Sequence, residues 1–378
     1  MKRPTTLLVL LLVITACCLS SCGGGGDSGT AKDSFPEETR HRLEEIVDDA
    51  MARNGAPGAV VGVWVPGTGT WVAAKGQADV SSGRAMQAGD RFRVGEVTET
   101  FTATVVLQLV DEGRVKLDDP LSVYFPGATQ VAAITVRQLL NHTSGLFDYR
   151  DDEAFQGVMQ QQPARRWSPE ELVGIAFTHP PNFPPGQEFR YSSTDYIILG
   201  LLVKTTTASD LEEEVNRRII DRAGLLNTYF IHNLAMVGQY SHGYLQLAGG
   251  NQQDVSNLFD PSWVWAAGAM TSNQDDLEVF ARVLANGDLL SRASQRERLK
   301  TVPAVLEGSK MDYGLGIASW RGFLGYAGYY PGYDCAVFYH PVHETTIVVF
   351  FNRTAPAANS EALRVLQEIV EVLYPTSS

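Results

Sequence analysis

The stretch from Phe92 to Gly113, FRVGEVTETFTATVVLQLVDEG, decides the fold because its apolar residues recur at the spacing of a buried helix. The helix is expected to open near Gly95, and the apolar positions that follow are Phe101, Val105, Val106, Leu109 and Val110. Glu96 and Glu99 are three residues apart, so they share a face of this helix, one turn from each other. Two carboxylates at the start of a core helix are either functional or unusually placed surface charges.

Composition limits the class of protein. The chain has 378 residues, enough for one large domain or two smaller ones, and its hydrophobic fraction of 44% can fill a substantial core. Its net charge of −13, without a Lys/Arg-rich run, argues against nucleic acid as a partner.

The N-terminus is typical of an exported protein. Lys2 and Arg3 precede LLVLLLVITACCL, an apolar run too short to span a bilayer permanently, so residues 1–21 are predicted to be a signal peptide. The following LSSCGGGG resembles the lipobox of bacterial lipoproteins, which implies that Cys22 carries a lipid and that residues 22–34 form a flexible tether. The protein would then be lipid-anchored on the outer face of the cytoplasmic membrane. The alternative is an ordinary signal peptide whose cleavage region contains a cysteine.

Cysteine usage agrees with export. Cys17 and Cys18 would leave with the signal peptide and Cys22 would carry the lipid, so Cys335 is the one thiol of the mature chain. Cys335 lies in DCAVFY, which reads as a strand, and we therefore predict a buried, inert thiol.

The order of predicted elements favours an α/β (α+β) fold with an antiparallel sheet flanked by helices. A helix over 37–54 precedes a hairpin in GAVVGVWVPGTGTWVAAKG, and four strand-like runs precede a closing helix over 360–373. The segment 118–297 reads as mostly helical. One domain over 35–375 is predicted, in which 35–117 and 298–375 build the sheet and 118–297 is a helical insertion.

Five blocks carry a family resemblance. They are FRVGEVTETFTATVVLQLVDEGRVKLDDPLSVYFPG, ITVRQLLNHTSGL, PPGQEFRYSSTDYIILGLLV, AAGAMTSNQDDLEVFARVL and GYAGYYPGYD, in this order. Together they resemble the serine beta-lactamase-like and penicillin-binding-protein family, which includes D-alanyl-D-alanine carboxypeptidases, class C beta-lactamases and related esterases. The resemblance covers residues 36 to 375 and implies that family's fold.

The resemblance also locates the family's active site. Its motifs are S-x-x-K at the start of a core helix, Y-x-N, and K-T-G or H-x-G on a strand that lines the cleft. Here Glu96 and Glu99 replace the Ser and the Lys, and Tyr191 matches the family Tyr. Ser193 replaces the Asn, Tyr326 stands where the family has His or Lys, and Gly328 is kept.

These departures imply a degenerate site. A carboxylate that attacks an amide forms a readily reversed anhydride, and no Lys is present to activate an alcohol. We therefore expect no catalytic residue, no cofactor and no metal. The expected role is a pseudoenzyme of the cell envelope that binds a cell-wall peptide or an envelope protein.

Alternatives remain open at this stage. Glu96 and Glu99 could be solvated in an open cleft, or they could share a proton or capture a cation or amine. A hydrolase with a rebuilt site could use the two carboxylates as acid and base, or Ser193 with Tyr191. Side chains one helical turn apart do not flank a scissile bond, which weighs against the acid/base pair.

Other motifs have a simpler interpretation. In NHTSGL, Ser144 belongs to a structural turn and His142 is an orienting hydrogen-bonding group. His340, His343 and Glu344 of HPVHE form a polar hairpin turn, which is favoured over a metal site. Trp263 and Trp265 are expected in aromatic packing, with a cleft-lining role as the alternative.

Overall fold

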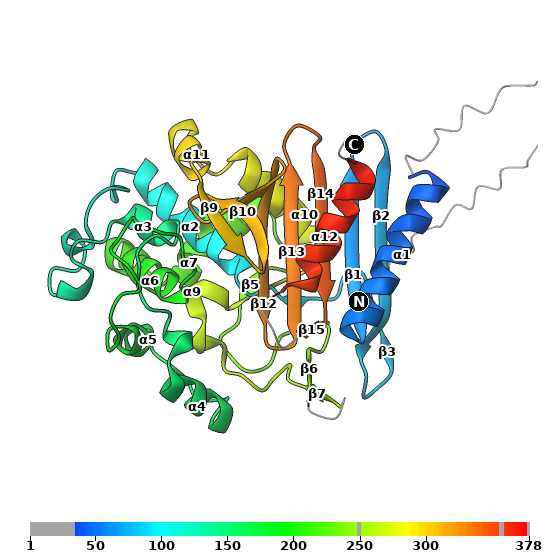
Figure 1. Cartoon of the computed structure of the whole chain (residues 1–378), viewed down its shortest axis with the longest axis horizontal. Coiled ribbons are helices and arrows are strands. Elements are labelled where there is room, and N and C mark those ends of the chain that lie inside the picture. The colour runs from blue at the N-terminus through cyan, green and yellow to red at the C-terminus, as the bar shows by residue number, and fades with distance from the viewer. Residues whose placement is uncertain (1–34, 248–250, 355–358, 376–378) are drawn as a thin grey trace, which may run out of the picture. The chain divides into compact units, whose positions relative to one another are not determined.

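The centre of the molecule is an antiparallel sheet whose strands come from both ends of the chain (Figure 1). The structure, a computed structural model, describes residues 35–247, 251–354 and 359–375. Over those residues the central sheet has nine strands. In spatial order they are β3 (Arg84–Ala85), β2 (Gly69–Asp79), β1 (Gly58–Val65), β14 (Thr345–Phe351), β13 (Tyr333–His340), β12 (Phe323–Tyr330), β11 (Ala318–Trp320), β10 (Ser309–Tyr313) and β9 (Val302–Leu306). The predicted fold class is confirmed.

Strands β1 and β14 join the two ends of the chain in the middle of this sheet. They pair antiparallel, with Val61 opposite Val349. Their sequences, GAVVGVWV and TTIVVFF, lack polar alternation because both strands are largely buried on both faces. The N–H of Gly58 donates to the side chain of Asn352, 294 residues away in the sequence, and so fixes the start of β1 against the end of β14.

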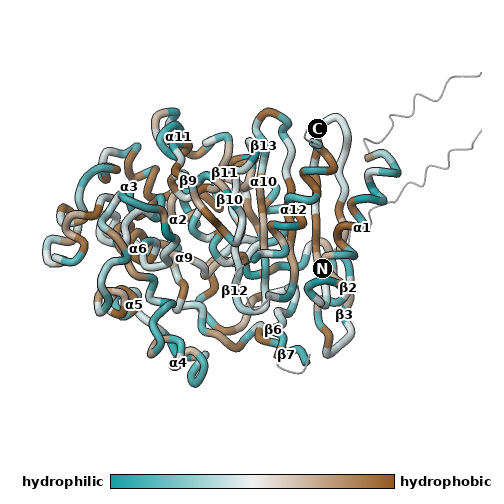
Figure 2. The backbone as a smooth tube through the Cα atoms, in the orientation of Figure 1, coloured by the Kyte–Doolittle hydropathy of each residue, from teal (hydrophilic) through white to brown (hydrophobic). Residues whose placement is uncertain are grey.

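Helices cover both faces of the sheet. On one face α1 (Glu37–Asn54) packs against α12 (Glu361–Leu373), and α12 packs against β13 and β14. The other face is covered by α2 (Val97–Asp111) and α10 (Gln274–Asn286), which contact β12 and β13. Figure 1 shows α12 in front of the sheet and α10 behind it. Figure 2 shows that α12 alternates hydrophobic and hydrophilic residues, as expected for a helix with one buried face.

The region between the two sheet-forming segments is mainly helical. Besides α10, its described α-helices are α3 (Val136–Leu140), α4 (Glu153–Gln161), α5 (Pro169–Ala176), α6 (Ser193–Thr207), α7 (Leu211–Val215), α8 (Asp221–Ala223), α9 (Trp265–Gly268) and α11 (Arg292–Arg298). Short strands, which the sequence did not predict, form two small sheets. They are β4 (Phe92–Arg93), β8 (Met270–Ser272) and β5 (Tyr229–Phe230), and β15 (Arg353–Thr354), β6 (Tyr244–Gln246) and β7 (Gln252–Asp254).

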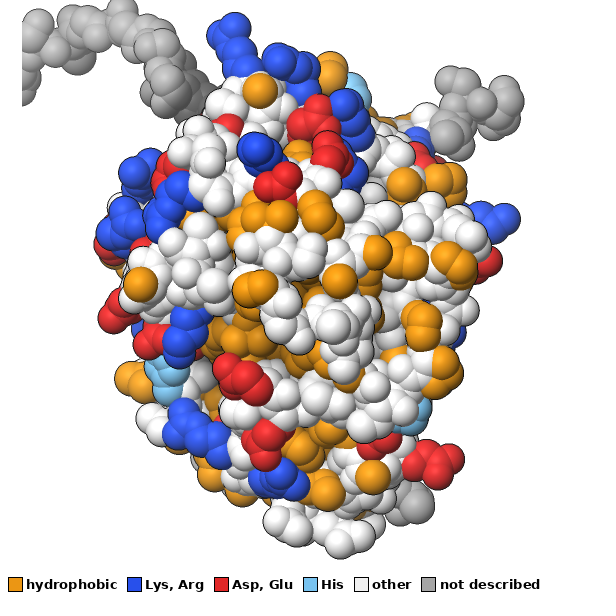
Figure 3. All heavy atoms as spheres, turned by 90° about the vertical axis from the view of Figure 1, so that its left-hand side faces the viewer, with side chains coloured by type: hydrophobic (Ala, Val, Ile, Leu, Met, Phe, Trp, Pro, Cys, Tyr) orange, Lys and Arg blue, Asp and Glu red, His pale blue; other side chains and the backbone are white. Residues whose placement is uncertain are grey.

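The surface of the molecule carries charges of both signs. On the face in Figure 3, positively and negatively charged side chains are interspersed around hydrophobic recesses.

Among the described helices, none combines the length and the apolarity needed to cross a membrane. Cys335 is fully buried in β13, and burial raises the pKa of its thiol well above the ordinary value, as expected of an inert thiol. The predicted signal peptide, the predicted tether and Cys22 lie outside the described residues.

Candidate functional site

The first turn of α2 lies directly against strand β12, and two glycines permit this approach. Gly95 precedes the helix with φ +50, and a Cβ there would lie 2.2 Å from the carbonyl oxygen of Tyr329. A Cβ on Gly328 would lie 2.5 Å from the backbone nitrogen of Glu96. The close contact places residue 96 beside the backbone of Tyr329.

Gly328→Ala should therefore lower the free energy of unfolding by about 1–3 kcal/mol or more, because backbone atoms of α2 would have to move. Urea unfolding followed by circular dichroism measures this loss. Gly157→Ala in α4 is the matched control, since a Cβ there meets nothing within 4 Å. The control should be neutral or stabilising by about 0.5–1 kcal/mol. Equal stability of the two variants would contradict the close packing.

Glu96 is buried and ion-paired. Nη1 of Arg150 lies 3.0 Å from its Oε1, and the backbone N–H of Tyr329 donates to its Oε2 at 2.7 Å. Arg150 is itself fixed by Asp148, whose Oδ2 accepts from Nη2 at 3.0 Å and from Nε at 3.1 Å. Both oxygens of Glu96 therefore have a donor before any ligand is present.

Glu99 is also fully buried and lies within hydrogen-bonding distance of side chains from three different segments. The hydroxyl of Tyr191 donates to Oε1 at 2.7 Å, and the hydroxyl of Tyr326 donates to Oε2 at 2.9 Å. Nε2 of His142 lies 3.3 Å from the same Oε2. Glu99 therefore connects α2 with the segment before α6, with β12 and with the loop after α3.

The network continues through His142 to the first turn of α6. Nδ1 of His142 lies 3.1 Å from Oδ2 of Asp195, and the hydroxyl of Ser144 donates to Oδ1 of Asp195 at 2.5 Å. His142 has a left-handed backbone, with φ 54. This conformation is uncommon outside glycine, and the surrounding contacts hold it in place.

Burial sets the electrostatics of these carboxyl groups. Burial raises the pKa of Glu96 to about 7, and the charge of Arg150 opposes the rise. Burial likewise raises the pKa of Glu99 to about 8, against hydrogen bonds from Tyr191 and Tyr326. The pKa of Asp195 is raised to about 6 by burial, with His142 opposing. The solvated interpretation of Glu96 and Glu99 is therefore wrong, because both side chains are buried and residues 97–109 of α2 are packed inside the molecule.

Glu99→Gln should stabilise the protein at alkaline pH. A carboxyl whose pKa rises from 4.5 to about 8 on folding costs no stability below pH 4.5, and the protein loses stability as the pH rises from 4.5 to about 8. The neutral amide removes this loss, so the gain should be on the order of 5 kcal/mol at pH 9 and near zero at pH 4.5. Urea midpoints across pH 4.5–9 measure it, with Glu44→Gln on the exposed side of α1 as control. A gain that is the same at every pH would contradict the shifted pKa.

Ser193, the residue in the family's Asn position, lies inside this network. Its hydroxyl is 3.1 Å from the hydroxyl of Tyr191, and its backbone N–H donates to Oδ2 of Asp148 at 3.2 Å. The residue is only 1% exposed. A chain of hydrogen bonds thus runs from Ser193 through Tyr191 to Glu99, but the hydroxyl faces the interior.

The structure brings together every family position named from the sequence: Glu96, Glu99, Tyr191, Ser193, Tyr326 and Gly328. It adds three residues that sequence reasoning did not single out, Asp148, Arg150 and Asp195. All three lie within a few residues of the quoted blocks, in FDYRDD and SSTDY. Charged residues beside a recognised motif were the signal that could have identified them.

The remaining candidates lie elsewhere. His340 ends β13, and His343 and Glu344 belong to the turn before β14. Across the described segments, no cluster of three or more His, Cys, Asp or Glu side chains could hold a metal ion. Trp263 is buried near Tyr330, in agreement with the packing prediction, and Nε1 of the partly exposed Trp265 donates to Glu212.

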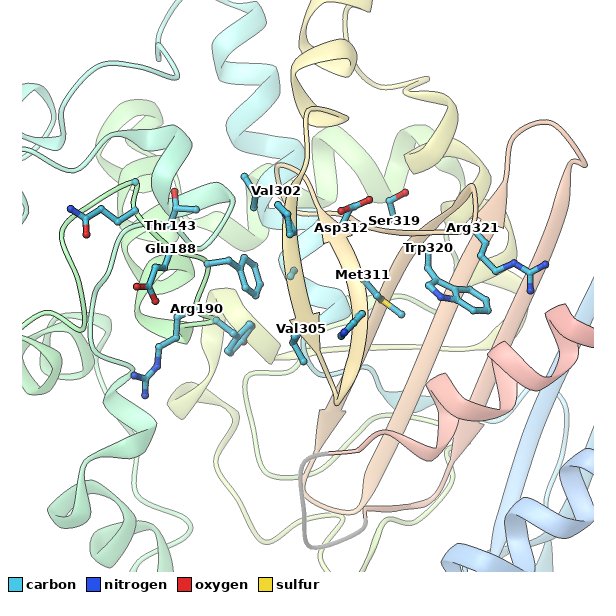
Figure 4. Close-up of a pocket in the computed structure, with 17 residues that line it drawn as sticks. Thr143, Glu188, Arg190, Val302, Val305, Met311, Asp312, Ser319, Trp320 and Arg321 are labelled. Atoms are coloured by element: carbon cyan, nitrogen blue, oxygen red, sulfur yellow. The ribbon is translucent and has the colours of Figure 1, made fainter. Parts of the chain in front are cut away.

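An open groove with a volume of about 1020 Å³ lies next to the buried network. Segment 186–191 forms one side, and strands β9, β10 and β11 form the other (Figure 4). Tyr191 borders the groove and also hydrogen-bonds to Glu99. Glu188, Arg190, Lys310 and Asp312 place charges of both signs along it.

Several known proteins are similar to this chain in sequence and in fold. The model of the Beta-lactamase family matches residues 43–371. Penicillin-binding protein 4* of Bacillus subtilis (strain 168) is 22% identical over 309 residues, 76% of this chain and 66% of its own length. A D-aminopeptidase of Cereibacter sphaeroides (strain ATCC 17029 / ATH 2.4.9) is 26% identical over 323 residues, 83% of this chain and 60% of its own length. The chain thus spans less than two thirds of these curated relatives.

Solved structures agree over nearly their whole length. A D-stereospecific amidohydrolase from Streptomyces sp. is 31% identical, with a TM-score of 0.77 over 90% of this chain and 98% of the other. A D-amino acid amidase from Ochrobactrum anthropi SV3 is 25% identical, with a TM-score of 0.79 over 89% of this chain and 99% of the other. The matched region includes all the site positions described above, and this chain belongs to the beta-lactamase family.

Proposed function

We propose that this protein is a non-acylating member of its family that binds peptides at the cell envelope. The observation that supports this most directly is the position of the Glu96 carboxylate. It lies at the start of α2, where the family's nucleophile would stand, and it accepts bonds from Arg150 and from the N–H of Tyr329. A backbone donor that could stabilise an oxyanion is therefore already occupied by the carboxyl group of Glu96.

The chemistry of the two carboxylates supports the same conclusion. Acyl transfer needs a nucleophile with a free lone pair and a base that accepts its proton. The oxygens of Glu96 and Glu99 accept bonds from Arg150, Tyr329, Tyr191 and Tyr326. These bonds hold both carboxylates in place, and an anhydride formed by either would revert readily.

The class of ligand follows from the relatives and from the groove. The names of the similar proteins refer to penicillin, D-amino acid amides and D-aminopeptidase activity. We propose that this chain binds peptides that contain D-amino acids. The groove beside Tyr191, with charges of both signs along its length, is large enough for such a ligand.

One comparison tests the absence of acylation. The purified protein is incubated with a fluorescent penicillin, with a fluorophosphonate probe and with D-amino acid p-nitroanilides, beside an active family member. No labelling and no hydrolysis are expected. Hydrolysis that disappears in Glu96→Gln would make the carboxylates catalytic and would overturn the proposal.

A second candidate is an esterase that uses Ser193. The observation in its favour is the hydrogen-bonded chain from Ser193 through Tyr191 to Glu99, which could remove a proton from the hydroxyl. The depth of Ser193 weighs against it. Fluorophosphonate labelling of the unmodified protein that is lost in Ser193→Ala would establish this candidate instead.

Anchoring is the other part of the proposal. If Cys22 carries a lipid, the protein should partition into the detergent phase of a Triton X-114 extract. Cys22→Ala should be released into the medium or remain unprocessed, while Cys335→Ala should behave as the unmodified protein. Unchanged membrane association of Cys22→Ala would contradict the lipid anchor.

A further inference from the structure

We infer that Arg150 and the N–H of Tyr329 form a carboxylate-binding site, which Glu96 fills in the resting protein. The α-carboxylate of an amino acid or peptide takes this place when Glu96 is neutral or absent. This inference rests on the proposed function, since it names the chemical group that the same site recognises.

The arrangement of donors is that of a site for one carboxylate. One oxygen of Glu96 accepts from a guanidinium nitrogen at 3.0 Å, and the other accepts from a backbone N–H at 2.7 Å. Charge-assisted bonds of this kind are the strongest that a carboxylate makes in proteins. An external carboxylate could use the same two donors in the same way.

The site does not depend on Glu96 for its shape. Asp148 holds Nε and Nη2 of Arg150, and the guanidinium lies 4.9 Å from the centre of the Tyr191 ring. Nη1 is left to point at Glu96. The other donor is part of β12, which is fixed in the central sheet. Removal of the Glu96 side chain should therefore leave both donors in place.

This end of the network reaches the surface. The side chain of Arg150 is 15% exposed and that of Glu96 is 8% exposed, whereas that of Glu99 is 0% exposed. Tyr329, whose N–H is the second donor, is 40% exposed. The Arg150 end of the network is therefore closer to solvent than the Glu99 end.

Protonation of Glu96 favours its replacement by an external carboxylate. The charged groups that face Glu96 are Arg150, Glu99 and, from the turn between β9 and β10, Glu307; Asp148 acts through Arg150. The pKa of Glu96 is raised to about 7, and that of Glu307 is raised to about 7 by burial and by the charge of Glu96. Below pH 7 both become neutral, while an α-carboxyl with a pKa of about 3.3–3.7 stays ionised. The external carboxylate then has no charged competitor.

The test uses N-acetyl-D-alanine and its uncharged analogue N-acetyl-D-alaninamide, with binding measured by ligand-observed NMR at pH 5.5 and 8. A site open only when Glu96 is neutral should bind N-acetyl-D-alanine about tenfold more tightly at pH 5.5 than at pH 8. Glu96→Ala should bind it at least about tenfold more tightly than the unmodified protein at pH 8. The gain should be lost in Glu96→Ala/Arg150→Met, and the amide should show none of these changes.

Two results would overturn the inference. One is a folded Glu96→Ala protein that does not prefer the acid to the amide. The other is equal affinity of the unmodified protein for the acid at both pH values, which decides the question even if Glu96→Ala does not fold. Both results are independent of the proposed absence of acylation, which fails only if the unmodified protein is acylated or hydrolyses a substrate.

Discussion

Arg150→Met is expected to lower the free energy of unfolding by about 3–5 kcal/mol at pH 8, the cost of leaving a buried charge without its partner. Arg150 is the cation that bonds to both Asp148 and Glu96. Burial alone would lower its pKa, yet the charges of Asp148 and its other neighbours raise the pKa well above the ordinary value. Methionine keeps much of the side-chain volume of arginine. The decrease in the free energy of unfolding therefore reports the removal of the charge.

The pH dependence and a matched control make this prediction specific. The loss should shrink toward pH 6, because Glu96, whose pKa is raised to about 7, then takes up a proton and no longer needs a cation. Arg190→Met, which removes an exposed arginine 3.6 Å from Asp151, should change stability by no more than about 0.5 kcal/mol. Urea unfolding at pH 6 and 8 measures both variants. Equal losses in the two would show that Arg150 is not the essential counter-charge.

Restoring the nucleophile and its amine should produce the second large effect. Glu96→Ser/Glu99→Lys removes the carboxylate from the N–H of Tyr329 and places an amine one turn from the new hydroxyl. Since a positioned base contributes about 10²–10⁴-fold, penicillin or ester probes should label the double variant at least about 100-fold faster than the unmodified protein. The rate should stay below that of active family members because Ser193 and Tyr326 are unchanged.

Glu96→Ser alone is the matched control. Its hydroxyl would face Glu99, which supplies no amine, so labelling should stay within about tenfold of the unmodified protein. Circular dichroism must first show that both variants are folded. A folded double variant that no probe labels would mean that the cleft has changed beyond these two positions.

The sequence predicted the parts of the fold that have strong periodicity. The helix expected over 37–54 is α1, and the helix expected over 360–373 is α12 with Ser360 as its N-cap. The small sheets were not predicted because strands such as β4, β5 and β15 have two residues each and carry no pattern. They are fixed by contacts with distant segments, which a local pattern does not contain.

Contacts between distant segments of the site could not be predicted from the sequence either. Motif positions located Glu96, Glu99 and Tyr326, but the sequence did not reveal that Arg150 pairs with Glu96 or that Asp195 pairs with His142. The buried threonines of α2 satisfy their hydroxyls inside the molecule, as Thr102 does by donating to the carbonyl of Ala266. The burial that raises the carboxyl pKa values is a property of this packing.

The pairing of β1 with β14 has a consequence for the folding of the chain during its synthesis. A chain that emerges from its N-terminus presents β1 long before β14 exists, so the middle of the sheet stays open until residues 345–351 arrive. Contacts between such distant segments slow folding because a long loop must close first. The partly synthesised chain is thereby exposed to proteases and aggregation until β14 is in place.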